Sequence, residues 1–229
     1  EAGDDVELAD RFAGRLQFGT AGLRAAVAAG PMRMNRLVVR QAAAGIGQWL
    51  LDSVPDAADR GVVIARDARR KSDVFAVDTA RVLAAMGIKA MLHPGLTPTP
   101  VLAWSITGLK AAAGVVVTAS HNPPADNGYK VFLDTGSQIV NPIDNEIAAR
   151  IDRFDPLTVE LAAEDHPLIR WLDTSWDEAY LADIPAVRLH PEVPGVPIAY
   201  TAMHGVGGEM IAAAFTVAGF DVPLVVAEQ

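Results

Sequence analysis

The chain has 229 residues, 51% of them hydrophobic, which is enough for one large domain or for one domain and part of another. Its formal charge of -9 disfavours nonspecific binding to nucleic-acid phosphates, and the absence of cysteine excludes disulfides and thiolate chemistry. No apolar run approaches the ~18 residues of a membrane span and no targeting segment is visible, so we expect a cytoplasmic protein that binds neither nucleic acid nor membranes.

The N-terminal part of the chain predicts two helices. Apolar residues at helical spacing indicate a helix over residues 5–17, and Asn35 is a good N-cap for a second helix that runs to about residue 53. Between them, residues 18–24 read Phe-Gly-Thr-Ala-Gly-Leu-Arg. The two glycines predict a loop whose backbone can approach other groups closely, and the loop ends in a cation.

Strands and helices alternate from residue 61 onwards. We expect strands at 61–65, 88–93 and 114–118, and helices at 72–86 and 100–106. Ser72 is expected to cap the first of these helices and Gly87 to close it. The alternation predicts an α/β fold with a mainly parallel sheet sandwiched by helices.

Two further elements complete this first domain. Residues 129–133 predict a short edge strand, antiparallel because the link from the strand before it is a loop. Residues 141–154 predict a helix with Pro142 near its first turn. We therefore expect residues 1–155 to form one α/β domain with a mixed, mainly parallel sheet.

The composition changes after residue 155. Residues 156–195 mix prolines and acids and carry one amphipathic stretch around residues 171–181, which predicts a connecting segment with a helix. Residues 196–229 then restart the alternation as strand, glycine-rich turn, helix (208–218) and strand (222–227). A unit below ~40 residues rarely buries a core alone, so we expect the truncated start of a second, similar α/β domain.

Residues 118–124, Thr-Ala-Ser-His-Asn-Pro-Pro, are the segment most indicative of chemistry. They follow an apolar strand, and ligands of open parallel sheets bind beyond the carboxyl ends of strands, so Ser120 is delivered to the functional edge. The two prolines lower the entropy lost in holding Ser120 and His121 in one geometry. Local chemistry leaves two readings open: a reactive serine, or a polar loop in which Ser120 caps the backbone.

Cations recur around this serine in the predicted fold. Arg24 ends the glycine-bearing loop, where a guanidinium can grip phosphate in a bidentate way. Arg69, with Asp67, follows the first predicted strand of the alternation, and Lys130 lies within ten residues of Ser120. Each could be a solvated surface charge, but in an acidic chain their gathering around one strand-end serine predicts a phosphate site.

Together these motifs resemble the α-D-phosphohexomutases, the family of phosphoglucomutases and phosphomannomutases with a phosphopentomutase branch. The Thr-Ala-Ser-His-Asn-Pro loop is similar to the family's phosphoserine loop, with Ser120 as the phosphorylated residue. Residues 18–24 match its N-terminal signature, and residues 33–35 are similar to the phosphopentomutase-like branch. Further family segments are matched in the correct order by residues 97–100, 127–130 and 204–208. The resemblance spans about residues 16–229.

The resemblance implies an intramolecular phosphotransferase, an isomerase that interconverts the 1-phosphate and the 6- or 5-phosphate of a hexose or pentose. Phospho-Ser120 would give its phosphoryl group to the free hydroxyl of a sugar phosphate. The sugar bisphosphate so formed would turn over and return its first phosphate to the serine. The sequence leaves open which sugar is used and which oligomeric state the protein adopts.

The resemblance also implies roles for single residues. The catalytic set would be Ser120, His121, Arg24 and Lys130, the substrate-binding set Thr20, Arg24, Asn122 and Lys130, and the supporting loop residues Gly19, Gly22, Asp67 and Arg69. Mg2+ would bind the phosphate on Ser120 and an aspartate loop of the second domain that this chain does not include, and a sugar bisphosphate would act as activator. Without that loop and the later domains, we expect the chain itself to be inactive.

Three other functions compete with this reading. A serine hydrolase is disfavoured because Ser120 lacks the Gly-x-Ser-x-Gly elbow and no His–acid pair is identifiable. A dinucleotide site at residues 205–208 is disfavoured because its glycines read Gly-x-Gly-Gly rather than Gly-x-Gly-x-x-Gly. A non-catalytic phosphosugar-binding fragment stays as the alternative, and phosphate on Ser120 of the full-length protein would discriminate between the two.

Overall fold

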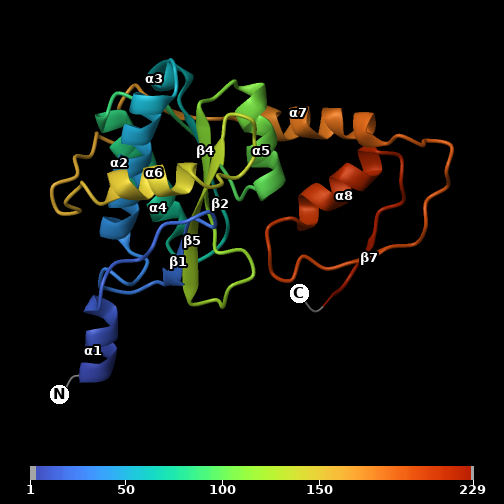
Figure 1. Ribbon diagram of the computed structural model, residues 1–229. Coiled ribbons are helices and arrows are strands. Elements are labelled where there is room, and N and C mark those ends of the chain that lie inside the picture. Colours follow the sequence, from blue (N-terminus) through green and yellow to red (C-terminus); the bar gives the residue numbers. More distant parts are fainter. Residues whose placement is uncertain (1–3, 228–229) are drawn as a thin grey trace.

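A six-stranded sheet lies at the centre of the computed structural model, which describes residues 4–227 (Figure 1). The strands are β1 (Leu23–Ala26), β2 (Val62–Arg66), β3 (Ala90–Leu92), β4 (Ala113–Val117), β5 (Asp126–Leu133) and β6 (Ile169–Trp171), in the spatial order β1-β5-β4-β2-β3-β6. β2, β3, β4 and β6 are parallel, and β5 is antiparallel to both of its neighbours. The predicted mixed, mainly parallel sheet is confirmed.

Helices cover both faces of the sheet. The helices of the described residues are α1 (Asp5–Phe12), α2 (Arg36–Ser53), α3 (Ala57–Arg60), α4 (Ser72–Ala85), α5 (Thr99–Gly108), α6 (Ile143–Ile151), α7 (Ser175–Asp183) and α8 (Gly208–Val217), with a 3-10 turn η1 (Ile184–Val187). α2, α4 and α6 cover one face, where Ile46 of α2 and Ile64 of β2 belong to the same buried cluster. α5 covers the other face, where Leu102 and Ile106 pack with Val63. Alternate residues of a strand therefore face opposite layers.

Local signals set several helix boundaries. Asn35 caps α2 as predicted, since its Oδ1 accepts two backbone N–H groups of the first turn at 3.1 Å. Gly87 follows α4 with a φ of +80°, also as predicted. The prediction that Ser72 caps α4 is wrong: Ser72 is the first helical residue and Lys71 holds the cap position. The hydroxyl of Ser72 instead donates to Asp67 at 2.7 Å, so it is not available to the helix end.

Three other expectations differ from the structure. β5 is not an edge strand, because β1 pairs with its outer side; β1 has only four residues next to a glycine turn, too short a run for a strand to be predicted. β6 forms the opposite edge, where the sequence predicted a connecting helix, and only α7 of that stretch is helical. The first helix ends at Phe12 rather than at residue 17, and α1 projects away from the sheet (Figure 1).

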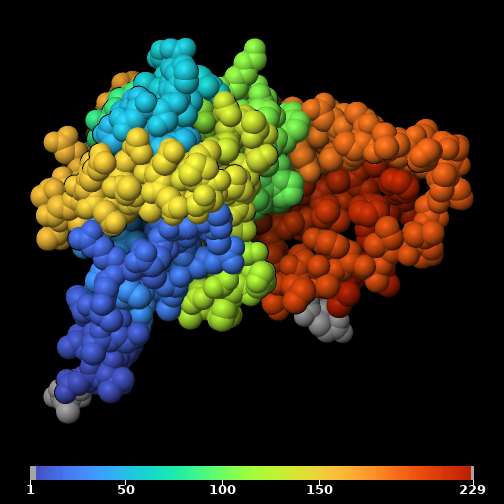
Figure 2. Space-filling model, viewed as in Figure 1, coloured from blue at the N-terminus to red at the C-terminus, as the bar shows by residue number. Residues whose placement is uncertain are grey.

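Beyond β6 the chain forms a lobe at one side of the molecule (Figure 2). α7 docks on α5 through Trp104, whose ring lies edge-on to Trp176 and Tyr180 at 5.8 and 5.9 Å and whose Nε1 donates to Asp183 at 2.8 Å. β7 (Ala199–Tyr200) and β8 (Leu224–Val225) pair in parallel with α8 between them, so the predicted strand–helix–strand unit is present. α8 packs against α7 and η1, yet none of its residues is fully buried.

A buried carboxylate ties α2 to α4. Asp78 of α4 is 1% exposed and accepts from Nε and Nη2 of Arg36 at 2.7 and 2.8 Å, and from the same atoms of Arg40 at 3.1 and 3.3 Å. Burial raises the pKa of this carboxyl, but the hydrogen bonds from Arg36 and Arg40 outweigh burial, so the pKa of Asp78 is lowered below its usual value. The ionised form is thus the one that stabilises the helix pair.

Replacing Asp78 with asparagine is expected to lower the free energy of unfolding by about 1–3 kcal/mol at pH 7, measured by urea denaturation. A depressed pKa contributes stability above the unfolded-state value and loses it as pH falls through the folded-state value. The difference between wild type and variant should therefore shrink below about pH 4. Asp73→Asn, at an exposed position of the same helix, is the control and should change stability by less than about 0.5 kcal/mol. Equal losses in both variants, or a difference that does not depend on pH, would contradict this account.

Candidate active site

Ser120 lies at the tip of the loop that follows β4, which we call the Ser120 loop (residues 118–125). All of β4 is buried, so the strand carries the loop to the carboxyl edge of the sheet. Thr118 anchors the turn: its N–H donates to Gly128 O at 3.1 Å and its Oγ1 accepts from Ser120 N at 3.0 Å. Ser120 is exposed and has a φ of +54°, a left-handed conformation that non-glycine residues seldom adopt. The serine is thus presented to solvent on a tight, defined turn.

Arg69 holds this loop through the backbone. Its Nη1 donates to the carbonyls of Pro123 and Asp126 at 2.8 and 3.0 Å, and its Nη2 donates to those of Ser120 and Asn122 at 2.8 and 2.7 Å. These four bonds fasten both ends of the turn to one rigid guanidinium. The structure therefore brings Arg69 to the Ser120 loop, where the sequence predicted a supporting residue.

Asp67 and Asn127 connect Arg69 to the rest of the domain. Asp67 Oδ1 accepts from the Arg69 backbone N–H at 2.9 Å and from the Ser72 hydroxyl at 2.7 Å. The Ser72 Oγ in turn accepts from Asn127 Nδ2 at 2.9 Å, and Asn127 Oδ1 accepts from Gly128 N at 2.7 Å. The network links the end of β2, the start of α4 and β5. Asn127 is the member that sequence reasoning missed as a structural residue, although it lay in a matched family segment.

Arg24 reaches the same edge from β1. It pairs with Gly128 in the β1–β5 register, and the two neighbouring strands leave no room for a side chain at Gly128: a Cβ there would lie 2.6 Å from Thr118 O and 3.2 Å from Arg24 Cγ. The side chain of Arg24 therefore passes over Gly128 towards the Ser120 loop. Its Nη1 lies 3.4 Å from Asn122 Oδ1, a weak contact, and its buried Nε has no partner among residues 4–227.

Lys130 lies on the same face of β5 as Gly128, because residues two apart in a strand face the same way. Partial burial lowers the pKa of Lys130, and the positive charge of Arg24 lowers it further. Neither Arg24 nor Lys130 forms an ion pair with a carboxylate in the described part of the chain. This cation pair (Arg24 and Lys130) is therefore not neutralised by those residues, and an anion bound beside it would be stabilised.

Asn122 and His121 follow Ser120 in the loop, and only Asn122 is held by a good side-chain hydrogen bond. Asn122 Nδ2 donates to Asp126 Oδ2 at 3.0 Å, which turns the amide oxygen of Asn122 towards Arg24. The sequence analysis did not identify Asp126, and only its spacing of four residues from Asn122 could have suggested this hydrogen bond. His121 is exposed, and its Nδ1 lies 3.5 Å from Ser120 Oγ, too long for an effective hydrogen bond in this state.

The glycine-bearing loop forms a tight turn ahead of β1. Gly19 and Gly22 exchange backbone hydrogen bonds, with Gly22 N donating to Gly19 O at 2.7 Å. Gly22 has a φ of +74°, and a Cβ there would lie 1.8 Å from Tyr129 O, so only glycine fits. Thr20 is exposed at the tip and its carbonyl accepts from Gln138. The structure therefore places Gly19 and Gly22 as supports of β1, and shows no hydrogen bond from Thr20 to the Ser120 loop.

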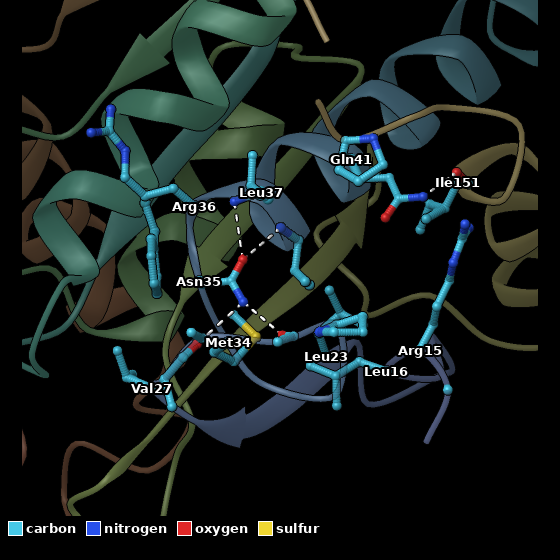
Figure 3. A pocket seen from close by; sticks show the side chains of 18 of the residues that line it. Arg15, Leu16, Leu23, Val27, Met34, Asn35, Arg36, Leu37, Gln41 and Ile151 are labelled. Atoms are coloured by element: carbon cyan, nitrogen blue, oxygen red, sulfur yellow. Dashed lines mark hydrogen bonds between the residues drawn. The ribbon is translucent and has the colours of Figure 1, made fainter. Parts of the chain in front are cut away.

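A large apolar cavity lies elsewhere in the described residues. It has a volume of about 930 Å³ and is enclosed mainly by apolar side chains of residues 12–38, α4 and the end of α6. Figure 3 shows Asn35 within it, with its carboxamide engaged by backbone groups. Ser120, Arg24 and Lys130 do not line this cavity. The candidate site is the edge around Ser120, where the cation pair lies near an exposed serine.

Two kinds of feature are absent from residues 4–227. No helix there has both the length and the apolar composition needed to cross a membrane. No group of three or more His, Cys, Asp or Glu side chains is arranged to hold a metal ion in that part of the chain. Within residues 4–227 the side chains therefore form no metal cluster of their own, and the Mg2+ that the family resemblance implies would find oxygen ligands of the kind it prefers in a phosphate on Ser120.

Comparison with known proteins gives a consistent family. Residues 15–157 match the family described as "Phosphoglucomutase/phosphomannomutase, alpha/beta/alpha domain I". A Haemophilus influenzae protein named "Probable phosphomannomutase" is 43% identical over 204 residues, covering 86% of this chain and 40% of the relative. The mouse phosphopentomutase is 35% identical over 240 residues, covering 99% of this chain and 39% of the relative.

A crystal structure of a Thermus thermophilus protein assigned as a phosphomannomutase superposes with a TM-score of 0.74 and 29% identity, covering 93% of this chain and 45% of that one. The chain thus spans about two fifths of the length of the curated relatives. The resemblance drawn from the motifs is confirmed by the matched domain and by relatives of the same type. The chain belongs to the phosphoglucomutase/phosphomannomutase family.

Proposed function

We propose that the protein containing this chain is a phosphosugar mutase that uses Ser120 as a phosphoryl carrier. The strongest support is that two features occur at the same edge of the sheet. One is the exposed Ser120 in a left-handed conformation, and the other is the cation pair, which has no carboxylate partner in the described residues. A phosphate on Ser120 would carry about -1.5 to -2 charge at neutral pH, and the cation pair offers the compensation that this charge needs.

The reaction proceeds by two transfers. The free hydroxyl oxygen of a sugar monophosphate attacks the phosphorus of phospho-Ser120, the bond from phosphorus to the serine oxygen breaks, and a sugar bisphosphate forms. After the bisphosphate turns over, Ser120 Oγ attacks its other phosphate and the isomeric monophosphate leaves. Catalysis consists mainly of positioning and charge neutralisation, because the moving group spreads negative charge over its oxygens.

The residues of this chain divide these tasks. Arg24 and Lys130 neutralise phosphate charge, and Asn122, held by Asp126 and in weak contact with Arg24, is a polar contact for the sugar phosphate. His121 is the candidate proton carrier for the attacking hydroxyl, since side chains that are too distant in a free site often close on the substrate. We include Thr20 as a substrate contact from the exposed turn before β1.

Mg2+ would supply further charge neutralisation to the transferring phosphate. We propose that this chain contributes only the phosphate on Ser120 to that ion, because residues 4–227 hold no cluster of three His, Cys, Asp or Glu side chains. The 229-residue chain alone is accordingly expected to bind Mg2+ weakly and to lack mutase turnover. A sugar bisphosphate would activate the full-length protein by charging Ser120, with a hexose or pentose monophosphate as substrate.

The test is intact mass analysis of the full-length protein after incubation with a sugar bisphosphate. We expect a substoichiometric gain of one phosphate, mapped by peptide fragmentation to Ser120 and removed by excess sugar monophosphate. A coupled assay with glucose, mannose and ribose phosphates would then identify the sugar. Binding of sugar phosphate with neither phosphate on Ser120 nor turnover would contradict the proposal and favour a non-catalytic phosphosugar-binding protein.

A further inference from the structure

Arg69 differs from the cation pair in how its hydrogen-bonding capacity is used. The two Nη nitrogens of an arginine carry four N–H bonds, and those of Arg69 make four bonds to carbonyl oxygens of residues 120, 122, 123 and 126. Its Nε lies 3.4 Å from Asp67 Oδ2. No Nη hydrogen is left for a phosphate. Arg24, in contrast, has one weak bond of 3.4 Å and an unpartnered Nε.

We propose that Arg69 is a positioning residue of the phosphoryl relay: it holds Ser120 in its left-handed conformation and does not contact the phosphate. The proposal rests on the proposed function for its catalytic consequence. A left-handed non-glycine residue costs about 1–2 kcal/mol, and such residues persist only where their surroundings over-determine them. Arg69 meets that condition at Ser120, because it binds the carbonyl of Ser120 itself and three carbonyls downstream.

The backbone N–H and the Nε of Arg69 also have a partner, Asp67. Asp67 accepts from the Arg69 backbone N–H and lies beside its Nε, so the side chain leaves the β2–α4 link in one direction. Through Ser72 and Asn127 the same network reaches Gly128, the residue opposite Arg24. One hydrogen-bond network therefore holds both the Ser120 loop and the part of β5 beside the cation pair. Release of Arg69 would let Ser120 move relative to cations that stay in place.

The test compares Arg69→Met and Arg69→Lys with Arg70→Met in the full-length protein. Arg70 is the matched control: it adjoins Arg69, and its side chain donates to Val27 O at 3.0 Å rather than to the Ser120 loop. Two quantities are measured, amide hydrogen exchange over residues 119–126 and the steady-state constants kcat and KM. The exchange measurement needs neither substrate nor phosphate, so it reads the conformation of the loop alone.

We expect Arg69→Met to speed exchange in the loop by at least about tenfold and to lower kcat by about tenfold, with KM within about threefold of wild type. Misplacement of a reacting group by about 1 Å can lower a rate by up to ~10²-fold. Because the loop keeps its other anchors when Arg69 is replaced, we expect a smaller fall in rate than that. Arg69→Lys should be intermediate, because an ammonium has three donors for four carbonyls. Arg70→Met should match wild type in both readouts.

Loop exchange in Arg69→Met equal to that of wild type would overturn the inference, and so would faster exchange with an unchanged kcat. A rise in KM without a fall in kcat would also overturn it, because it would assign Arg69 to substrate binding. Should Arg69→Met lose its native circular dichroism, Arg69→Lys, which keeps the charge, provides the comparison. If wild type proves to carry no phosphoserine and no mutase activity, the proposed function fails, and the exchange measurement still decides whether Arg69 holds the loop.

Discussion

Replacing Ser120 with alanine in the full-length protein is expected to abolish mutase turnover, with a fall in kcat of more than about 10³-fold. A relay without its carrier forms no bisphosphate intermediate, so the loss should appear in kcat far more than in KM. The fold should persist, because Ser120 is exposed and the turn around it depends on backbone carbonyls and on Thr118 rather than on the Ser120 hydroxyl. Turnover is measured with a coupled assay, and phosphate incorporation is measured by intact mass.

Ser53→Ala is the control for this variant, since it removes an exposed serine hydroxyl at the end of α2. It should leave turnover and phosphate incorporation unchanged. The Ser120→Ala protein should show no phosphate and a thermal midpoint within a few degrees of wild type. Full activity in Ser120→Ala, or phosphate retained on another residue with turnover intact, would remove the carrier role from Ser120.

Replacing Arg24 with alanine is expected to lower kcat by about 10- to 1,000-fold, because an oriented donor to a developing negative charge supplies a few kcal/mol. Arg24 is suited to this role since its Nε is buried without a partner in the described residues and its guanidinium lies at the Ser120 loop. Removing Arg24 also removes one of the two causes that lower the pKa of Lys130, namely the neighbouring positive charge. The measurement is steady-state turnover at saturating sugar phosphate.

Arg24→Ala and Arg69→Met should fail in different ways, which makes each a control for the other. Arg24→Ala should leave hydrogen exchange in the Ser120 loop at the wild-type rate, because its side chain makes only one hydrogen bond to that loop, the weak 3.4 Å contact with Asn122. Arg24→Lys should recover part of the activity, because it restores the positive charge but cannot donate two parallel N–H bonds to a phosphate as a guanidinium does. Turnover of Arg24→Ala within threefold of wild type would show that the cation pair does not stabilise the transferring phosphate.

The sequence predicted the parts of the site that follow strong strands. The run of valines in β4 and the polar loop directly after it were enough to place Ser120 at the carboxyl edge of a parallel sheet. The motif positions of Arg24 and Lys130 suggested one shared edge, and the structure brings both to the face of β5 beside Gly128. Single-residue roles in catalysis stay predictions until the variants are assayed.

What the sequence could not predict depends on contacts between distant segments. β1 has four residues and no periodicity of its own, so its place at the sheet edge is set by pairing with β5. β6 has three residues and pairs with β3 alone, so its strand character depends on that pairing and not on a periodic run of its own. Ser72 was expected at a helix cap, but Asp67 and Asn127 take its hydroxyl for the network beneath the loop. Tertiary partners overrode local preference in each case.

The pairing of β1 with β5 also bears on how the site assembles during synthesis. β2, β3 and β4 can pair with one another as they emerge, but β1 has no partner until β5 exists, and Arg24 meets Asn122 across 98 positions of sequence. At ~5–20 residues per second, that separation corresponds to roughly 5–20 s of translation, during which β1 remains an unpaired strand. Long-range pairings of this kind also form late because loop closure must be paid for before their contacts form. The serine turn and its Arg69 anchor can therefore form while Arg24 of β1 is still free, and the phosphate site is finished only when β1 pairs with β5.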